Sequence, residues 1–392
     1  MRKLSRTRKG QAVLAACALL ASIRPASATS PSFCRGKVAT IVGTDGHDQL
    51  EGTSGNDVIV GLGGGDYVEG KGGDDLICLG PGGERDGRAQ EQATGGPGND
   101  TILGGSGDDL LAGGTGRDDL SGNSGRDTLY GGAGRDISRG ASGLDAFYDG
   151  DGDDTLYGGR GDDIFILRSQ GDDIFSGGPN GRYGDIISFA DAGLKSGRGV
   201  VVDLGLGISR GAGTDQISGV EAVWGTEQND LLIGDEERNI LLGMGGDNVL
   251  RGRAGDDCIH PGIGMNKAFG GQGYDFFMAE SLYCIPGDSA TAFSPFIFGL
   301  TVDLELGFAR YELRDEEWET TLSSIEGVFG SSHEDTLIGD EGNNDLRGMG
   351  SMDQIKGQGG DDLLDGGTDF DQVDGGGGND RCSGEAVVSC ED

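Results

Sequence analysis

The chain has 392 residues, of which 82 are glycine and 8 are proline, and its formal net charge is −37. Glycine at roughly three times its ordinary share without a Gly-x-y period excludes collagen and leaves either disorder or a regular glycine-rich repeat. So negative a chain makes nucleic acid an implausible partner and raises the question of whether bound cations balance the charge.

The first 28 residues have the pattern of a secretory signal peptide. A basic stretch at 2–9 precedes an apolar run at 11–23, and small residues at 26–28 form a cleavage site. We predict cleavage after Ala28 and secretion. A lipoprotein signal around Cys17 is the alternative, but part of the apolar run still follows that cysteine. The run is too short to span a bilayer, and the sequence predicts no other membrane span.

Nonapeptide units with the pattern GGxGxDxUx, where U is a large apolar residue, recur in register over more than half of the chain. Four units occupy 43–78, an uninterrupted series begins at 95, and six units each lie at 225–278 and 330–383. The run DGDGDD at 149–154 begins like an EF-hand loop. However, Asp154 and Arg160 stand where that loop requires glycine and glutamate, and the run fits the nonapeptide instead.

Each position of the unit has a physical role. Glycines at positions one, two and four allow tight turns with inward carbonyl groups, and the aspartate at position six adds a carboxylate. The last three residues are extended, with the apolar residue at position eight. Such strands cannot bury a core alone, so units should stack into two short parallel sheets with turns ~4.8 Å apart. Examples of the apolar residue are Ile102, Leu111, Leu120, Leu129, Phe147, Leu156 and Phe165.

Oxygen-rich, flexible turns of this kind suit Ca²⁺, which takes about six to eight oxygen ligands, better than Mg²⁺, which dehydrates reluctantly. The units resemble the RTX, or haemolysin-type, calcium-binding repeat. The resemblance implies an all-β, right-handed parallel β-roll solenoid with two nonapeptides per coil and Ca²⁺ between turns on the same edge. It also implies that glycine-turn carbonyls and position-six aspartates are the ligands. These aspartates are Asp57, Asp66, Asp75, Asp100, Asp109, Asp118, Asp127, Asp136, Asp154, Asp163, Asp257, Asp362, Asp371 and Asp380.

Several units depart from the pattern. Asn239, Asn248, Asn266 and Asn344 replace the aspartate, which removes charge and predicts weaker sites. Asp145 lies in a unit that lacks the second glycine, so we rank it below the other ligands.

Two bridging segments interrupt the repeats and duplicate each other: GVVVDLGLG at 199–207 matches GLTVDLELG at 299–307, and 217–239 aligns with 322–344. They are apolar and β-branched, which predicts strands that continue or cap the rolls. The predicted organisation is a signal peptide at 1–28, an N-terminal cap at 29–42, a repeat block at 43–176 with a loop insertion at 79–94, a bridge at 177–224, a second repeat block at 225–278, a bridge at 279–329, and a third block with a C-terminal cap at 330–392.

Cleavage of the signal peptide leaves an even number of cysteines, which favours disulfides in an exported protein. A zinc site is disfavoured because no Cys-x-x-Cys occurs. The cysteines cluster in three regions, which suggests the bonds Cys34–Cys78, Cys258–Cys284 and Cys382–Cys390, with other pairings open.

The sequence contains no convincing catalytic constellation. Ser209 lies in a match to the nucleophile-elbow pattern, but the duplicated bridge has Ala309 at that place and no helix is expected to follow. We therefore predict a secreted, non-catalytic protein with a binding or structural role, whose folding is driven by Ca²⁺. The alternatives are an extracellular enzyme, such as one that modifies polysaccharides, and a calcium-dependent adhesin or surface-layer component with a cell-surface or polysaccharide partner.

Overall fold

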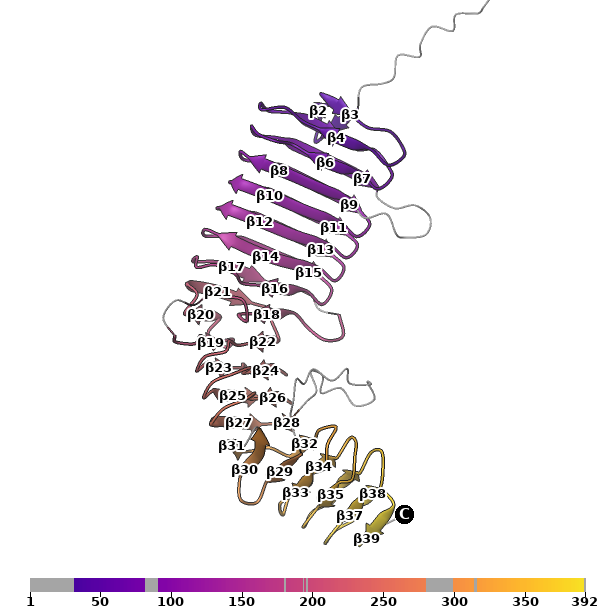
Figure 1. Cartoon of the computed structure of the whole chain (residues 1–392), viewed down its shortest axis with the longest axis vertical. Helices are drawn as coiled ribbons and strands as arrows, with labels where there is room; N and C mark the ends of the chain where they lie inside the picture. Colours follow the sequence, from indigo (N-terminus) through magenta and orange to yellow (C-terminus); the bar gives the residue numbers. More distant parts are fainter. Residues whose placement is uncertain are drawn as a thin grey trace, which may run out of the picture.

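A computed structural model describes residues 32–81, 91–179, 181–192, 194, 197–279, 299–313 and 316–390. The predicted signal peptide lies outside these residues. The described chain contains strands and no helix, and it forms a long parallel β-solenoid (Figure 1), so the predicted fold class is confirmed. It follows that the described part of the chain offers no helix that could cross a membrane.

Two sheets run along the solenoid, and alternate nonapeptides feed one sheet and then the other. Neighbouring strands pair in parallel with a shift of two units, as in Leu111 beside Leu129 and Leu120 beside Ser138, which confirms two nonapeptides per coil. Sheet 1 has 16 strands in the order β4 (Gln49–Glu51), β6 (Tyr67–Glu69), β8 (Gln92–Pro97), β10 (Leu110–Gly116), β12 (Thr128–Gly134), β14 (Ala146–Asp151), β16 (Ile164–Ile166), β18 (Ile186–Ser188), β22 (Ala222–Trp224), β24 (Ile240–Leu242), β26 (Cys258–His260), β28 (Phe276–Met278), β32 (Gly327–Phe329), β34 (Asp345–Arg347), β36 (Leu363–Asp365) and β38 (Arg381–Ser383).

Sheet 2 contains the other strand of each coil and additional strands from the bridges. Its pairings run in the order β3 (Ile41–Val42), β5 (Val58–Val60), β7 (Leu76–Pro81), β9 (Thr101–Ser106), β11 (Asp119–Ser124), β13 (Ile137–Ser142), β15 (Thr155–Arg160), β17 (Ile174–Ser176), β21 (Thr214–Ser218), β20 (Ile208–Arg210), β19 (Val201–Asp203), β23 (Leu231–Ile233), β25 (Val249–Ala254), β27 (Asn266–Gln272), β31 (Glu316–Ser323), β30 (Phe308–Leu313), β29 (Leu300–Asp303), β33 (Thr336–Ile338), β35 (Gln354–Lys356), β37 (Gln372–Asp374) and β39 (Ala386–Val388).

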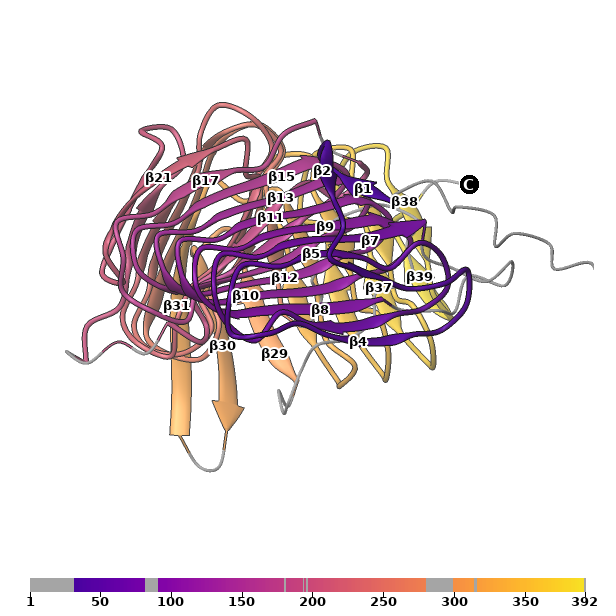
Figure 2. The same ribbon diagram turned by 90° about the horizontal axis from the view of Figure 1, so that it is seen from above.

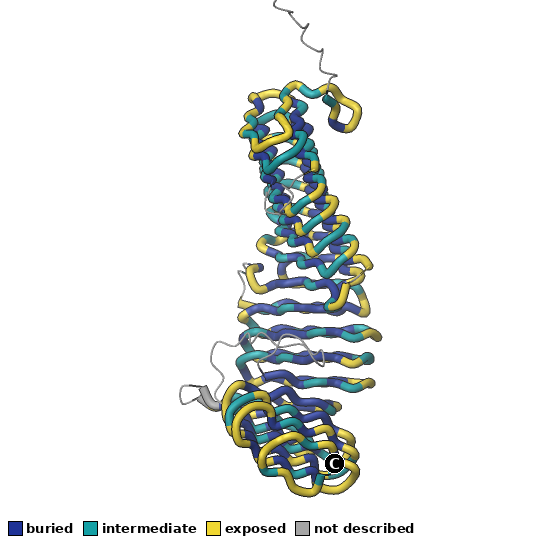
Figure 3. The backbone as a smooth tube through the Cα atoms, turned by 90° about the vertical axis from the view of Figure 1, so that its right-hand side faces the viewer, coloured by how far each residue is buried: buried dark blue, intermediate teal, exposed yellow. Residues whose placement is uncertain are grey.

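The core is a column of position-eight side chains between the two sheets. All seven apolar residues singled out from the sequence are 0–2% exposed, and Ser138, which replaces an apolar residue in one unit, is buried as well. In this column the rings of Phe147 and Phe165 stack with centroids 5.0 Å apart, and Phe175 meets Phe165 edge-to-face at 5.7 Å. Figure 3 shows buried stretches along the coils and exposed residues at many of the turns. The turns are therefore where ligands could reach the chain.

Each bridge adds strands to sheet 2. In the first bridge β21 continues the parallel order after β17, β20 and β19 follow it antiparallel, and β19 returns to parallel pairing with β23. The second bridge repeats this arrangement with β31, β30 and β29 between β27 and β33. The hairpin β30–β31 extends outward from the body of the solenoid (Figure 2). The bridges are thus β-rich, as predicted, and continue the same solenoid.

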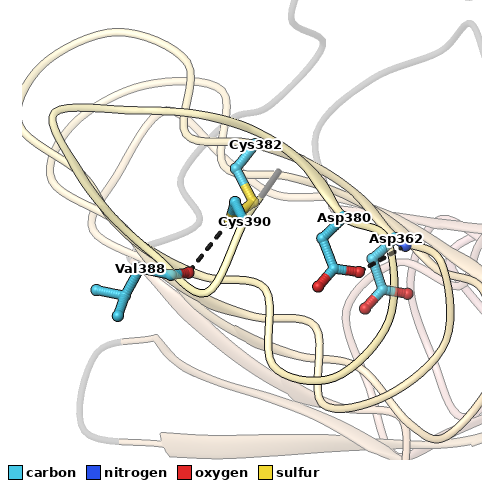
Figure 4. Close-up of a disulfide and its surroundings, with 5 residues drawn as sticks. All are labelled: Asp362, Asp380, Cys382, Val388 and Cys390. Atoms are coloured by element: carbon cyan, nitrogen blue, oxygen red, sulfur yellow. Dashed lines mark hydrogen bonds between the residues drawn. A yellow bond between two sulfur atoms is a disulfide. The ribbon is translucent and has the colours of Figure 1, made fainter. Parts of the chain in front are cut away.

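The ends of the solenoid are tied by disulfides. The short hairpin of β1 (Phe33–Cys34) and β2 (Lys37–Val38) is bonded to β7 through Cys34–Cys78, whose Cα atoms are 5.8 Å apart. Cys382 and Cys390 bond at the C-terminal end, with Cα atoms 5.9 Å apart (Figure 4). These two predicted pairings are confirmed. The third, Cys258–Cys284, cannot be followed because Cys284 lies outside the described residues.

The prediction of a loop at 79–94 is wrong at both ends of this range, where the chain forms strands. β7 continues to Pro81 and β8 begins at Gln92, while 82–90 lie outside the described residues. Gln92 pairs with Tyr67 on one side and with Leu110 on the other. The inserted residues therefore interrupt the nonapeptide register without interrupting sheet 1.

Candidate metal centre

The position-six side chains form two rows along the solenoid, each at the start of the strands of one sheet. Ladder 1 leads into sheet 1 and ladder 2 leads into sheet 2. Ladder 1 comprises Asp48, Asp66, Glu91, Asp109, Asp127, Asp145, Asp163, Asp185, Glu221, Asn239, Asp257, Asp275, Glu326, Asn344, Asp362 and Asp380. Ladder 2 comprises Asp57, Asp75, Asp100, Asp118, Asp136, Asp154, Asp173, Asp215, Asp230, Asn248, Asn266, Asp335, Asp353, Asp371 and Glu385. Every ligand aspartate predicted from the sequence lies in one of these rows.

One carboxylate oxygen of each typical ladder member joins neighbouring coils. The backbone N–H of Asp100 donates to Asp118 Oδ1 at 2.7 Å, and that of Asp118 donates to Asp136 Oδ1 at 2.8 Å. Ladder 1 repeats the bond, with Asp109 N–H 2.9 Å from Asp127 Oδ1. At the C-terminal end the same bond joins Asp362 to Asp380 (Figure 4). This bond fixes the orientation of the carboxylate and therefore the direction of its second oxygen.

The second oxygen, Oδ2, is buried in most ladder members and accepts no hydrogen bond from any described residue. A buried charged oxygen without a partner is strongly unfavourable, so a row of them needs an explanation. The ladder members with such an oxygen are Asp66, Asp75, Asp100, Asp109, Asp118, Asp127, Asp136, Asp145, Asp154, Asp163, Asp173, Asp185, Asp257, Asp275, Asp353, Asp362, Asp371 and Asp380.

In most of these units the unpaired oxygen lies beside the glycine at position one; the units of Asp154 and Asp173 have Asp149 and Arg168 there instead. A Cβ atom added at Gly104 would overlap Asp109 Oδ2 and would lie 2.9 Å from the carbonyl oxygen of Gly122 on the next coil. Only glycine fits at this position, because the surrounding oxygen atoms leave no room for a Cβ atom. Gly116, at position four, is required for a different reason, since its φ of 132° belongs to the left-handed region.

The hydrogen bonds of Asn248 show which carbonyl groups face this space in its unit. Asn248 Nδ2 donates to the carbonyl oxygens of Gly243 at 3.2 Å, Gly245 at 3.1 Å and Pro261 at 3.0 Å. These are positions one and three of its own unit and position one of the unit on the next coil. Where aspartate replaces asparagine, Oδ2 takes the place of this donor, and only oxygens converge.

A cation fits such a cradle of oxygens. Among the described residues, no three His, Cys, Asp or Glu side chains converge closely enough to hold a metal by themselves. A cation bound here would therefore take most of its ligands from backbone carbonyl groups, with one carboxylate from each unit. Such all-oxygen, flexible ligand sets are typical of Ca²⁺.

The ladders are electrostatically strained without a positive charge. Burial, reinforced by Asp127 and Asp108, raises the pKa of Asp109 to about 8. Burial likewise raises the pKa of Asp154 to about 8 and that of Asp118 to about 7, with backbone hydrogen bonds opposing the shift and neighbouring carboxylates adding to it. Burial at these positions therefore favours uptake of a proton or a nearby cation by the carboxylate.

Asp57 differs from the other predicted ligands because hydrogen bonds already satisfy its carboxylate. The backbone N–H of Thr53 donates to Oδ2 at 2.7 Å, the Thr53 hydroxyl at 2.8 Å, and the Thr40 hydroxyl donates to Oδ1 at 3.2 Å. These bonds, above all the one from the Thr53 backbone, lower the pKa of Asp57. Asp48 and Asp230 receive the same pair of bonds from Thr44 and Thr226.

The structure also adds ladder members that the sequence reasoning missed. Glu91 lies between Asp66 and Asp109 in ladder 1, and both of its buried carboxylate oxygens lack a donor among the described residues. Burial raises its pKa to about 9. Its signal in the sequence is an acidic residue directly before a strand triplet with a central apolar residue, Gln92-Ala93-Thr94. Asp145, ranked low from the sequence, is a regular ladder 1 member with an unpaired Oδ2.

The serine considered as a nucleophile is inaccessible. Ser209 is fully buried, and its hydroxyl donates to Asp215, a member of ladder 2. The match to the nucleophile-elbow pattern is therefore explained by a strand of the first bridge.

The fold and its ladders define a parallel β-solenoid with a row of buried acidic side chains at each of two edges. A family model for the RTX calcium-binding nonapeptide repeat matches residues 42–77, 91–120, 112–146, 130–165, 139–174, 224–259, 329–364 and 356–386, together more than half of the chain. The chain belongs to this family of calcium-binding repeat proteins. A search of curated proteins found no match.

Proposed function

We propose that this chain is a secreted Ca²⁺-binding β-roll protein with a binding or structural role, in which the ion drives folding. The observation that carries the proposal is the row of buried, unpaired Oδ2 atoms in each ladder. A Ca²⁺ ion between successive turns would be held by an aspartate Oδ2 and by the surrounding backbone carbonyl groups. The ion would supply the positive charge that these oxygens require, and its binding energy would become folding energy.

The same proposal includes secretion and the organisation into three repeat blocks joined by two bridges. Two disulfides support secretion, because such bonds persist mainly in oxidising compartments. The predicted signal peptide with cleavage after Ala28 would direct export.

A single substitution tests the ligand assignment. We expect Asp127→Asn to keep the Oδ1 bond from Asp109 N–H and to replace Oδ2 with an amide group, which removes a negative ligand. The variant should therefore fold in excess Ca²⁺ but bind about one ion fewer than the wild type. Isothermal titration with Ca²⁺ and a parallel metal analysis of the dialysed protein would measure this difference.

Asp151→Asn is the matched control, because Asp151 is exposed at position three of a unit further along the same repeat block. It removes the same charge and should leave the number of bound ions unchanged. A wild-type protein that binds no Ca²⁺ at millimolar concentration would refute the proposed function. Equal ion counts for Asp127→Asn and the wild type would refute the role of Asp127.

A further inference from the structure

We propose that ladder 2 of the second repeat block is locked by the side-chain amides of Asn248 and Asn266 in place of Ca²⁺, so that this edge stays ordered when calcium is removed. The inference rests on the proposed function, because it divides the edges of the solenoid into calcium-dependent and calcium-independent ones. It also differs from the expectation that asparagine simply weakens a site.

The amide groups occupy the place that a cation would take. Asn248 Nδ2 donates to the three carbonyl oxygens described above, and Asn266 Nδ2 donates to those of Gly262 at 2.9 Å and Gly264 at 3.2 Å. Asn248 and Asn266 are 1% and 2% exposed. An amide N–H carries positive partial charge, so it both satisfies these carbonyl groups and repels a cation from the same space.

Asp230 completes this edge without a free oxygen. Its carboxylate accepts hydrogen bonds from Thr226 N–H at 2.6 Å, from the Thr226 hydroxyl at 3.0 Å and from Val200 N–H at 2.6 Å. Asp230 N–H then donates to Asn248 Oδ1, and Asn248 N–H donates to Asn266 Oδ1, both at 2.8 Å. Three successive ladder members are therefore satisfied by described groups of the chain itself.

At the opposite edge of the same block, Asn239 is followed by two carboxylates in the calcium-type arrangement, Asp257 and Asp275. Asp257 N–H donates to Asp275 Oδ1 at 2.9 Å, and the Oδ2 atoms of both residues are buried without a described donor. The two edges of one block thus differ in side chains and not in fold.

The third repeat block supplies an internal comparison. Asp353 and Asp371 follow Asp335 with the same spacing by which Asn248 and Asn266 follow Asp230, and their backbone N–H bonds repeat the pattern. Their Oδ2 atoms are buried and unpaired within the described chain. Two neighbouring negative charges in this ladder correspond to two neutral amides in the second block, so only the third block must recruit cations there.

Hydrogen exchange of the full chain, read by mass spectrometry in EDTA, tests the inference. We expect peptides that contain β25 and β27 to retain protection, whereas peptides that contain β35 and β37 exchange at least tenfold faster than in excess Ca²⁺. Equal loss of protection in the two pairs of strands would overturn the inference.

Reciprocal variants of the two blocks provide a test that does not depend on whether one particular variant folds. Asn248→Asp with Asn266→Asp should add about two bound Ca²⁺ ions and abolish the protection of β25 and β27 in EDTA. Asp353→Asn with Asp371→Asn should lose ions and gain protection of β35 and β37. Asn229→Asp adds one exposed charge in the second block and should change neither quantity.

The outcomes separate this inference from the proposed function. If the wild type binds no Ca²⁺, the proposed function and this inference are both wrong. If the wild type binds Ca²⁺ but neither double variant changes the ion count or the protection pattern, only the assignment of the amide-locked edge is wrong.

Discussion

Chelation of calcium with EDTA is expected to unfold most of the solenoid, with the strands β25 and β27 as the exception. Neighbouring ladder carboxylates are one coil apart, a separation of ~4.8 Å. Two such charges repel by about 3 kcal/mol at an effective dielectric constant of roughly 20, and many of these pairs are stacked in each ladder. The short strands bury one apolar side chain per nonapeptide, which cannot offset both this repulsion and the loss of chain entropy.

Far-ultraviolet circular dichroism and small-angle X-ray scattering would follow the transition. We expect loss of the β signal and an increase in the radius of gyration in EDTA, and recovery of both with millimolar Ca²⁺. Mg²⁺ at the same concentration is the control and should restore little, because it dehydrates reluctantly and demands stricter geometry. A circular dichroism spectrum that changes neither with EDTA nor with Ca²⁺ would show that the ion does not drive folding.

Acidification is expected to stabilise the calcium-free solenoid. Burial raises the pKa of Asp100 to about 6, that of Asp118 to about 7 and that of Asp109 to about 8 in the folded chain, with neighbouring carboxylates adding to each shift. An aspartate in the unfolded chain titrates near 3.9. Groups whose pKa is raised by folding stabilise the fold fully below the unfolded value, and this contribution is lost as pH rises through the folded values.

The pH window therefore lies between about 4 and 8. In EDTA, the urea concentration at which the β signal is half lost should fall steadily as pH rises across this window. In excess Ca²⁺ the trend should reverse, because protons compete with the ion for the same oxygens. A calcium-free protein that becomes more stable as pH rises would contradict the account of the ladders. Asp57 and the exposed Asp153, whose pKa values are lowered, oppose this trend but are outnumbered by the ladder carboxylates whose pKa is raised.

The periodic parts of the fold could be predicted because each nonapeptide carries its own turn, carboxylate and core residue. Leu111 and Leu129 have the same role in successive coils, so one unit specifies the next. The nine-residue repeat therefore sets the register in which the strands of successive coils pair. The position-six rule likewise placed every predicted ligand in a ladder, since the residue before each short strand lies at one edge for sheet 1 and at the other edge for sheet 2.

What the sequence did not predict depends on contacts between units. The nonapeptide pattern does not predict Glu91 as a ladder member, because the inserted residues shift it out of the repeat register. Gln92, the next residue, still pairs with Tyr67. The satisfied carboxylate of Asp57 depends on Thr53 at position two, where the repeat pattern has glycine. The hydrogen bonds of Asn248 involve Pro261 on the next coil, a contact that no single unit contains.

The antiparallel order of the strands in the bridges also had no local signal in the sequence. The sequence of the first bridge predicts strands, but the antiparallel order of β19, β20 and β21 within a parallel sheet depends on how the chain reverses between them. The second bridge, whose sequence duplicates that of the first, has the same antiparallel order in β29, β30 and β31.

A crystal structure grown in CaCl₂, with anomalous scattering data to identify the ions, is the most direct test of the central claim. We predict Ca²⁺ next to Oδ2 of Asp109, Asp118, Asp127 and Asp136, coordinated by turn carbonyl groups, and no ion next to Nδ2 of Asn248. Water or a hydrogen-bond donor beside those aspartate oxygens, with no anomalous peak along either ladder, would contradict it.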